Sequence, residues 1–206
     1  MDKEVIITLA GDGYAELTEK KSVFIGNAHP VTDEAGALEF IRSIRKKYSD
    51  ARHNVYAYSL RSGNITRYSD DGEPQGTGGL PVLEVIKKSG FNDAVIVVTR
   101  YFGGILLGTG GLVRAYSQAA ADAVRNAGIV RFALHAVFEV SLSYQDYNRL
   151  AGYLSGIKIL GCDFGENVKL RTAVEKGAEE TFTFKILDET SGRALISITG
   201  EDYFSV

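Results

Sequence analysis

The stretch VVTRYFGGILLGTGGLVRAY, from Val97 to Tyr116, passes from an apolar run through five glycines into an alanine-rich segment. The run that ends at residue 100, DAVIVVTR, is almost continuously apolar, which predicts a strand buried on both of its faces. Residues 111–128 are rich in good helix formers and end at a glycine, which predicts a helix. This stretch therefore predicts a buried strand, a glycine-rich turn and a helix.

Other elements are predicted on the N-terminal side of this stretch. The pattern of residues 21–31 is typical of a strand, and residues 32–50 change to the period of a helix with Thr32 as its N-cap. Two short strands, residues 53–60 and 64–70, are separated by a hairpin-sized turn. A loop then leads to a helix that starts at Pro81 and ends at Gly90.

A second series of predicted strands and helices begins at residue 133. Strands are predicted at 136–143, 157–164, 167–174 and 193–200, with a helix over 144–155. Residues 178–190 fit either a strand or a helix, and a helix there completes a βαββαβ ferredoxin-like unit. We therefore expect an α+β protein with two domains, residues 1–132 and 133–206.

Composition limits the classes of function. The net charge of −3 argues against a protein that coats nucleic acid through bulk charge. The charge is uneven, because residues 1–131 hold 16 basic against 15 acidic residues and residues 132–206 hold 7 against 11. Any contact with a polyanion is therefore expected in the first part. A single cysteine, Cys162, and the absence of a signal-peptide pattern or a long apolar run favour a cytoplasmic location with no membrane contact.

The glycine-rich turn is the first candidate site. Backbone amides at a turn before a helix can bind an anion, and arginines beside it can add bidentate phosphate contacts. Aromatic rings beside arginines are also typical of proteins that stack on RNA bases. Core packing and a tight turn explain the same residues, and both interpretations stay open. The predicted nucleic-acid or phosphate-binding residues are Arg100, Tyr101, Gly103, Gly104, Gly108, Gly110, Gly111, Arg114 and Tyr116.

The loop RYSDDGEPQGTGG, residues 67–79, is the second candidate site. Its carboxylates can bind Mg²⁺ or act as an acid and a base, but acidic residues beside Gly72 and Pro74 are also typical of turns. No His and Cys spacing typical of a zinc site is present, so no metal, cofactor or catalytic residue is assigned. The possible accessory residues are His53, Asn54, Arg67, Asp70, Asp71 and Glu73.

Three segments in this order, RHNVYAY, SDDGEPQGTGGLPVL and VVTRYFGGILLGTGGLVRAYSQA, strongly resemble the IMPACT family, and the two-domain layout resembles its bacterial YigZ-type members. The resemblance implies an N-terminal α/β sandwich similar to the second domain of a ribosomal protein. It also implies a ferredoxin-like C-terminal domain similar to one in an elongation factor, which favours a helix over residues 178–190. Eukaryotic relatives are translational regulators, and the resemblance assigns no catalytic role to any residue.

We therefore expect a regulator of translation, rather than an enzyme, that binds the ribosome or RNA through its N-terminal domain. The acidic C-terminal domain is expected to contact a protein partner. The alternative is a Mg²⁺-dependent enzyme or hydrolase that binds a phosphate or nucleotide between the DDGEP loop and the glycine-rich turn.

Overall fold

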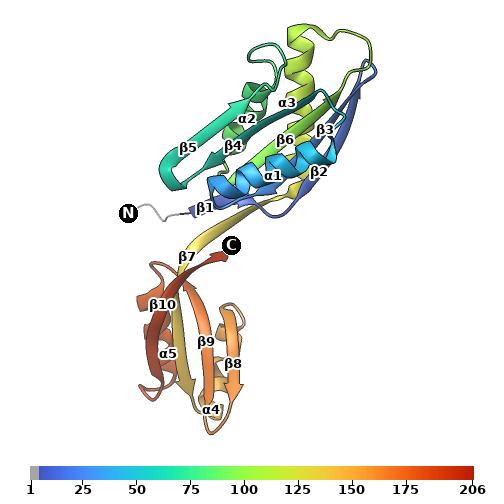
Figure 1. Cartoon of the computed structure of the whole chain (residues 1–206). Coiled ribbons are helices and arrows are strands. Elements are labelled where there is room, and N and C mark those ends of the chain that lie inside the picture. The colour runs from blue at the N-terminus through green and yellow to red at the C-terminus, as the bar shows by residue number, and fades with distance from the viewer. Residues whose placement is uncertain (1–4) are drawn as a thin grey trace. The chain divides into compact units, whose positions relative to one another are not determined.

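A computed structural model describes residues 5–206. Within this range the chain divides into two compact units, called here the N-terminal unit, Ile6–Val130, and the C-terminal unit, Arg131–Val206 with Val5. The elements of the N-terminal unit are drawn in blue to yellow-green and those of the C-terminal unit in yellow to red (Figure 1).

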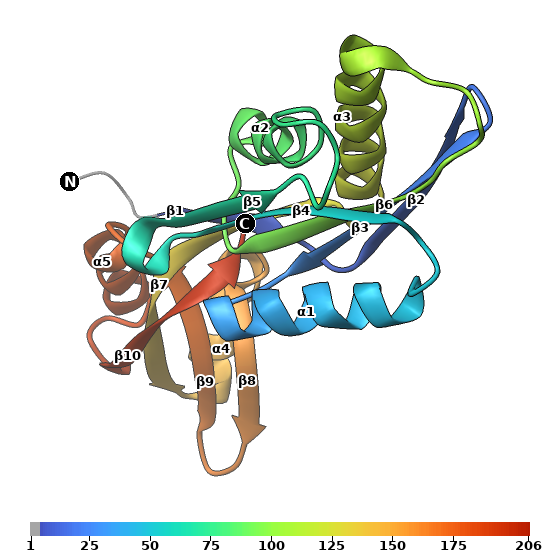
Figure 2. The ribbon, with the colours of Figure 1, turned by 45° about the horizontal axis from the view of Figure 1, so that its top comes forward.

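The N-terminal unit is built on a five-stranded antiparallel sheet. Its strand order is β2 (Gly13–Glu19), β3 (Ser22–Pro30), β6 (Ala94–Tyr101), β4 (His53–Leu60) and β5 (Ile65–Ser69). Helix α1 (Glu34–Lys47) covers one face, and α2 (Gly79–Ser89) and α3 (Gly108–Ala127) cover the other (Figure 2). A short 3-10 turn, Ser62–Asn64, joins β4 to β5. The α/β sandwich is confirmed.

Strand β6 lies at the centre of this sheet and is buried on both sides, as the apolar run predicts. Val95 and Val97 pack in the cluster with α1, whereas Ile96 and Val98 pack in the cluster with α2 and α3. Alternate residues of a strand point to opposite faces, so a strand between two helical layers must be apolar throughout. The glycine-rich turn therefore starts at the end of the most deeply buried strand.

Helix α3 packs through a narrow stripe of mostly small residues. Leu112, Tyr116, Ala119 and Ala123 recur at helical spacing, and all four are buried. Helix α1 differs in one detail from the prediction, because its N-cap is Asp33 rather than Thr32. The Asp33 carboxylate accepts a hydrogen bond from the Gly36 amide at 2.8 Å.

The C-terminal unit contains β7 (Ile129–Leu142), α4 (Tyr144–Leu154), β8 (Lys158–Phe164), β9 (Val168–Glu175), α5 (Glu179–Glu189) and β10 (Leu195–Ser205). The antiparallel strand order is β10-β7-β9-β8, and β1 (Val5–Leu9) also pairs with β7. Residues 179–189 form a helix, so the ferredoxin-like βαββαβ arrangement is confirmed. Among the described residues, no helix is long and apolar enough to cross a membrane.

Candidate functional site

Asp70 organises the loop between β5 and α2. Its carboxylate accepts hydrogen bonds from three backbone amides, those of Gly76 at 2.9 Å, Gly78 at 3.0 Å and Gly79 at 2.8 Å. These contacts fix the loop and satisfy amides at the start of α2, where no intrahelical partner exists. Asp70 therefore acts as a turn former and a helix cap.

Asp71 ties the same loop to β4 and to α1. Its carboxylate accepts a hydrogen bond from the Asn54 amide at 2.7 Å and forms an ion pair with Arg45 at 2.6 Å. Its carbonyl oxygen lies 2.9 Å from Nδ1 of His53. This arrangement indicates that His53 donates its Nδ1 proton to the loop, because a carbonyl oxygen only accepts. Both Asp71 and His53 are therefore engaged in holding the loop on the sheet.

Glu73 lies at the centre of a buried polar group that we call the Glu73 cluster, made of Glu73, Arg100, Tyr116 and His53. Its Oε1 accepts from the Arg100 guanidinium at 2.7 Å and from the Tyr116 hydroxyl at 2.7 Å, and His53 Nε2 lies 4.0 Å away. Glu73, Arg100 and Tyr116 are all buried. Burial and the adjacent carboxylate raise the pKa of Tyr116 far above its ordinary value, so its hydroxyl remains a donor.

The three carboxylates of the DDGEP loop thus each have protein partners. The described part of the chain also contains no group of three His, Cys, Asp or Glu side chains placed to bind a metal ion. The remaining accessory residues have separate roles. Asn54 accepts a hydrogen bond from the Thr99 hydroxyl at 2.7 Å within the sheet, and Arg67 is exposed on the edge strand β5.

Two predicted contact residues require correction. We expected Arg100 to bind phosphate and Tyr116 to stack on a base, but both side chains lie inside the protein. Tyr116 belongs to the buried stripe of α3, and Arg100 points into the interior toward Glu73. Phe102 is 52% exposed, and Cys162 is exposed. Tyr101 is partly buried and donates to Asp50 at 2.7 Å, which raises its pKa to about 12.

The glycine-rich turn lies directly against the β2–β3 hairpin. The Gly103 amide donates to the Ser22 hydroxyl at 3.1 Å, and a Cβ at Gly103 would lie 2.0 Å from the Lys21 carbonyl carbon and oxygen. Only glycine permits so close an approach of two backbones. Gly104 and Gly108 adopt φ of 81° and 71°, which side chains disfavour, and Gly110 and Gly111 lie in the first turn of α3.

A groove of about 760 Å³ runs between β2, α2 and α3. Its cationic side chains are Lys20 at the hairpin, Lys88 at the end of α2 and Arg114 on α3. Among residues 5–206, none of these three has an ion pair or a side-chain hydrogen bond. We call them the groove cations. The first turn of α3 has no side-chain cap, so its amides are also available to an anion. The other lining residues are Leu17, Glu19, Pro81, Glu84, Val85, Leu107, Gly111, Val113, Ala115, Ser117, Gln118 and Ala121.

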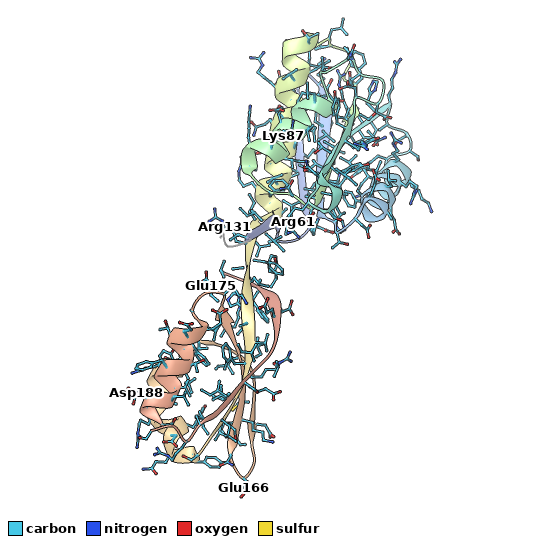
Figure 3. All side chains as sticks on the ribbon, turned by 90° about the vertical axis from the view of Figure 1, so that its left-hand side faces the viewer. Arg61, Lys87, Arg131, Glu166, Glu175 and Asp188 are labelled. Atoms are coloured by element: carbon cyan, nitrogen blue, oxygen red, sulfur yellow. The ribbon has the colours of Figure 1, made fainter. Side chains whose placement is uncertain are left out.

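The structure thus brings Arg114, Gly111 and the start of α3 into one groove, and it buries Arg100 and Tyr116 beside Glu73. Sequence reasoning missed Lys20 and Lys88 as site residues. A lysine in a hairpin turn and one in the last turn of a helix are ordinary surface residues in a sequence. Lys87, labelled in Figure 3, is the neighbour of Lys88 but pairs with Glu84 at 3.5 Å and does not line the groove.

Comparisons with known proteins agree with this architecture. The Impact N-terminal domain model matches residues 20–124. The IMPACT family member YvyE of Bacillus subtilis is 36% identical over 91% of this chain and 88% of its own length, and the IMPACT family member YigZ of Escherichia coli is 35% identical over 84% and 87%. A crystal structure of a hypothetical protein, 31% identical, superposes with a TM-score of 0.61 over 96% of this chain and 98% of that one. The chain therefore belongs to the IMPACT family.

Proposed function

We propose that this protein regulates translation by binding RNA on the ribosome through the groove of its N-terminal unit. The observation that carries the proposal is the set of groove cations. A protein with a net charge of −3 gathers three unpaired cations around one groove, which also reaches Gly111 in the uncapped first turn of α3. Phosphate groups are the natural ligands of such a surface, because each contact neutralises charge and releases a counterion.

The acidic side chains of the groove do not cancel this charge. Glu84 pairs with Lys87, which leaves Glu19 as the carboxylate opposite Lys20, Lys88 and Arg114. The groove is also shaped by a helix pair and a hairpin rather than closed on all sides, which suits a chain of phosphates better than one small ligand. Ribosome binding would place the protein in the cytoplasm.

The C-terminal unit, in this proposal, contacts a protein. Its helices α4 and α5 cover one face of the sheet, and the other face holds a groove of about 570 Å³. Both signs of charge line that groove, with Lys169 and Arg171 beside Glu139 and Asp163. Mixed charges of this kind favour a protein surface over a polyanion.

Co-sedimentation of the purified full chain with ribosomes tests the proposal. The double variant Lys88→Ala, Arg114→Ala is expected to lose most ribosome binding at physiological salt. The matched control is Arg125→Ala, which removes a cation of α3 that pairs with Asp122 at 2.8 Å and does not line the groove. Ribosome binding by the double variant equal to that of the control would contradict the proposal.

The alternative of a Mg²⁺-dependent enzyme has no comparable support. Each carboxylate of the DDGEP loop is held by backbone amides, by Arg45 or by the Glu73 cluster. A metal ion or a water-activating base would need at least one of these carboxylates to leave its partners. We therefore do not propose a catalytic role for this loop.

A further inference from the structure

We infer that the Phe102 ring is a stacking platform for an unpaired base, so that the RNA class bound by this groove is single-stranded. This inference rests on the proposed function and adds the substrate class. Phe102 is 52% exposed on the glycine-rich turn, which also holds the exposed residues Ile105 and Leu106. An exposed ring on a turn that contacts the hairpin of the unpaired Lys20 matches the way in which proteins hold single strands.

One groove cation, Lys20, belongs to the hairpin that contacts the turn just after the ring. In the β3–β6 register Tyr101 pairs with Val23, so Phe102 follows at the level of Ser22. The backbone of Lys21 lies against Gly103, the residue after Phe102. Lys20, a groove cation, precedes Lys21, and Leu107, at the other end of the turn, also lines the groove. A base on Phe102 would therefore have its phosphates close to the positive charge of the hairpin.

The buried Arg100 side chain also contacts the Phe102 ring and restrains it. The Arg100 guanidinium carbon lies 5.4 Å from the centre of the Phe102 ring and 5.5 Å from that of the buried Phe24 ring. The Glu73 carboxylate fixes the guanidinium by an ion pair of 2.7 Å. A cation–π contact with a fixed guanidinium limits the movement of Phe102. The Glu73 cluster thus gives the platform its rigidity, and a ring that is already positioned loses less entropy when a base stacks on it.

Duplex RNA offers this ring no equivalent contact. The bases of a duplex are stacked within the helix, and only an unpaired base can present its face to an aromatic side chain. The groove cations would contact the phosphates of a duplex and of a single strand alike. The ring therefore determines the preference between the two.

Fluorescence anisotropy with the full chain tests this inference. The probes are a short labelled oligouridine and a labelled RNA duplex of the same length. The wild type is expected to bind the oligouridine more tightly than the duplex. Phe102→Ala is expected to weaken oligouridine binding about tenfold or more while leaving duplex binding unchanged, and Phe102→Tyr is expected to retain binding. The control is Tyr68→Ala, which removes a 48% exposed ring from β5.

Unchanged oligouridine binding by folded Phe102→Ala would overturn the inference. If Arg114→Ala still weakened binding in that case, the proposed function would stand without the stacking platform. Loss of ribosome binding by Phe102→Ala with unchanged oligouridine binding would also overturn it, because the ring would then contact a ribosomal protein. If the wild type bound neither RNA nor ribosomes, the proposed function would fail as well.

Discussion

The Arg100 guanidinium and the Glu73 carboxylate form a buried ion pair, with 2.7 Å between Nη1 and Oε1. Glu73 comes from the DDGEP loop, and Arg100 is the residue before the last in strand β6. The pair therefore joins the two motifs that stand out in the sequence. The Tyr116 hydroxyl donates a second hydrogen bond to the same oxygen. The buried Arg100 Nε has no hydrogen-bond partner among the described residues, which costs free energy. Cation–π contacts of the guanidinium with Phe24 and Phe102 compensate part of this free-energy cost.

Glu73→Gln is expected to destabilise the protein by about 3–5 kcal/mol, because it leaves the Arg100 charge buried without a counter-charge. The double variant Glu73→Leu, Arg100→Met is expected to be more stable than Glu73→Gln, since it removes both charges together. Unfolding of the full chain in urea, which carries no charge, measures the free energy of unfolding for each variant.

The control for this comparison is Lys87→Met on α2. Lys87 and Glu84 form an exposed pair, whose loss should cost less than about 1 kcal/mol. If Glu73→Gln were no more destabilised than Lys87→Met, the Glu73 cluster would not be the structural link described above.

Gly103→Ala is expected to destabilise the protein by more than about 1 kcal/mol and to weaken RNA binding. Its Cβ would overlap the Lys21 backbone, so the turn and the hairpin would have to separate. Gly110→Ala is the matched control, because nothing lies within 4 Å of its Cβ position and it lies in the first turn of α3. That change is expected to be neutral or stabilising by about 0.5–1 kcal/mol. Equal effects of the two substitutions on thermal unfolding would argue against a tight turn–hairpin contact.

Asp146 makes the stability of the C-terminal unit depend on pH. Its bond with Arg193, at 2.6 Å, and a second bond with Ser143 lower its pKa below the ordinary value. A lowered folded-state pKa contributes stability that is present above the unfolded-state pKa of about 3.9 and is lost as the pH falls through the folded-state pKa. Asp146→Asn should therefore be less stable than the wild type at pH 7, and the two melting temperatures should converge in acid. A difference that stayed constant with pH would assign the loss to packing rather than to ionisation.

Much of the fold was predictable because the residues repeat with the period of the structure they form. The apolar run of β6 and the alanine-rich stripe of α3 are long and regular, and both predictions are confirmed. Strand β2 was not predicted. Its inward positions include Gly13 and Ala15, which are too small to produce a hydrophobic alternation.

The candidate site was harder to predict, although part of the signal was present. Tyr116 lies four residues after Leu112 and three before Ala119, a spacing that places it on the buried face of α3. Arg100 lies near the end of a strand that is apolar on both sides, which is evidence for a buried arginine with a partner. In contrast, no local pattern links Lys20, Lys88 and Arg114, since only the packing of three separate elements gathers them in one groove.

The most direct test of the account is the salt dependence of ribosome binding by the full chain, compared among the wild type, Arg114→Ala and Arg125→Ala. If Arg114 contacts a phosphate in the groove, Arg114→Ala should bind more weakly and its log–log slope against salt should decrease in magnitude by about 1, whereas Arg125→Ala should keep the wild-type slope. Equal slopes for all three proteins would contradict RNA binding by the groove.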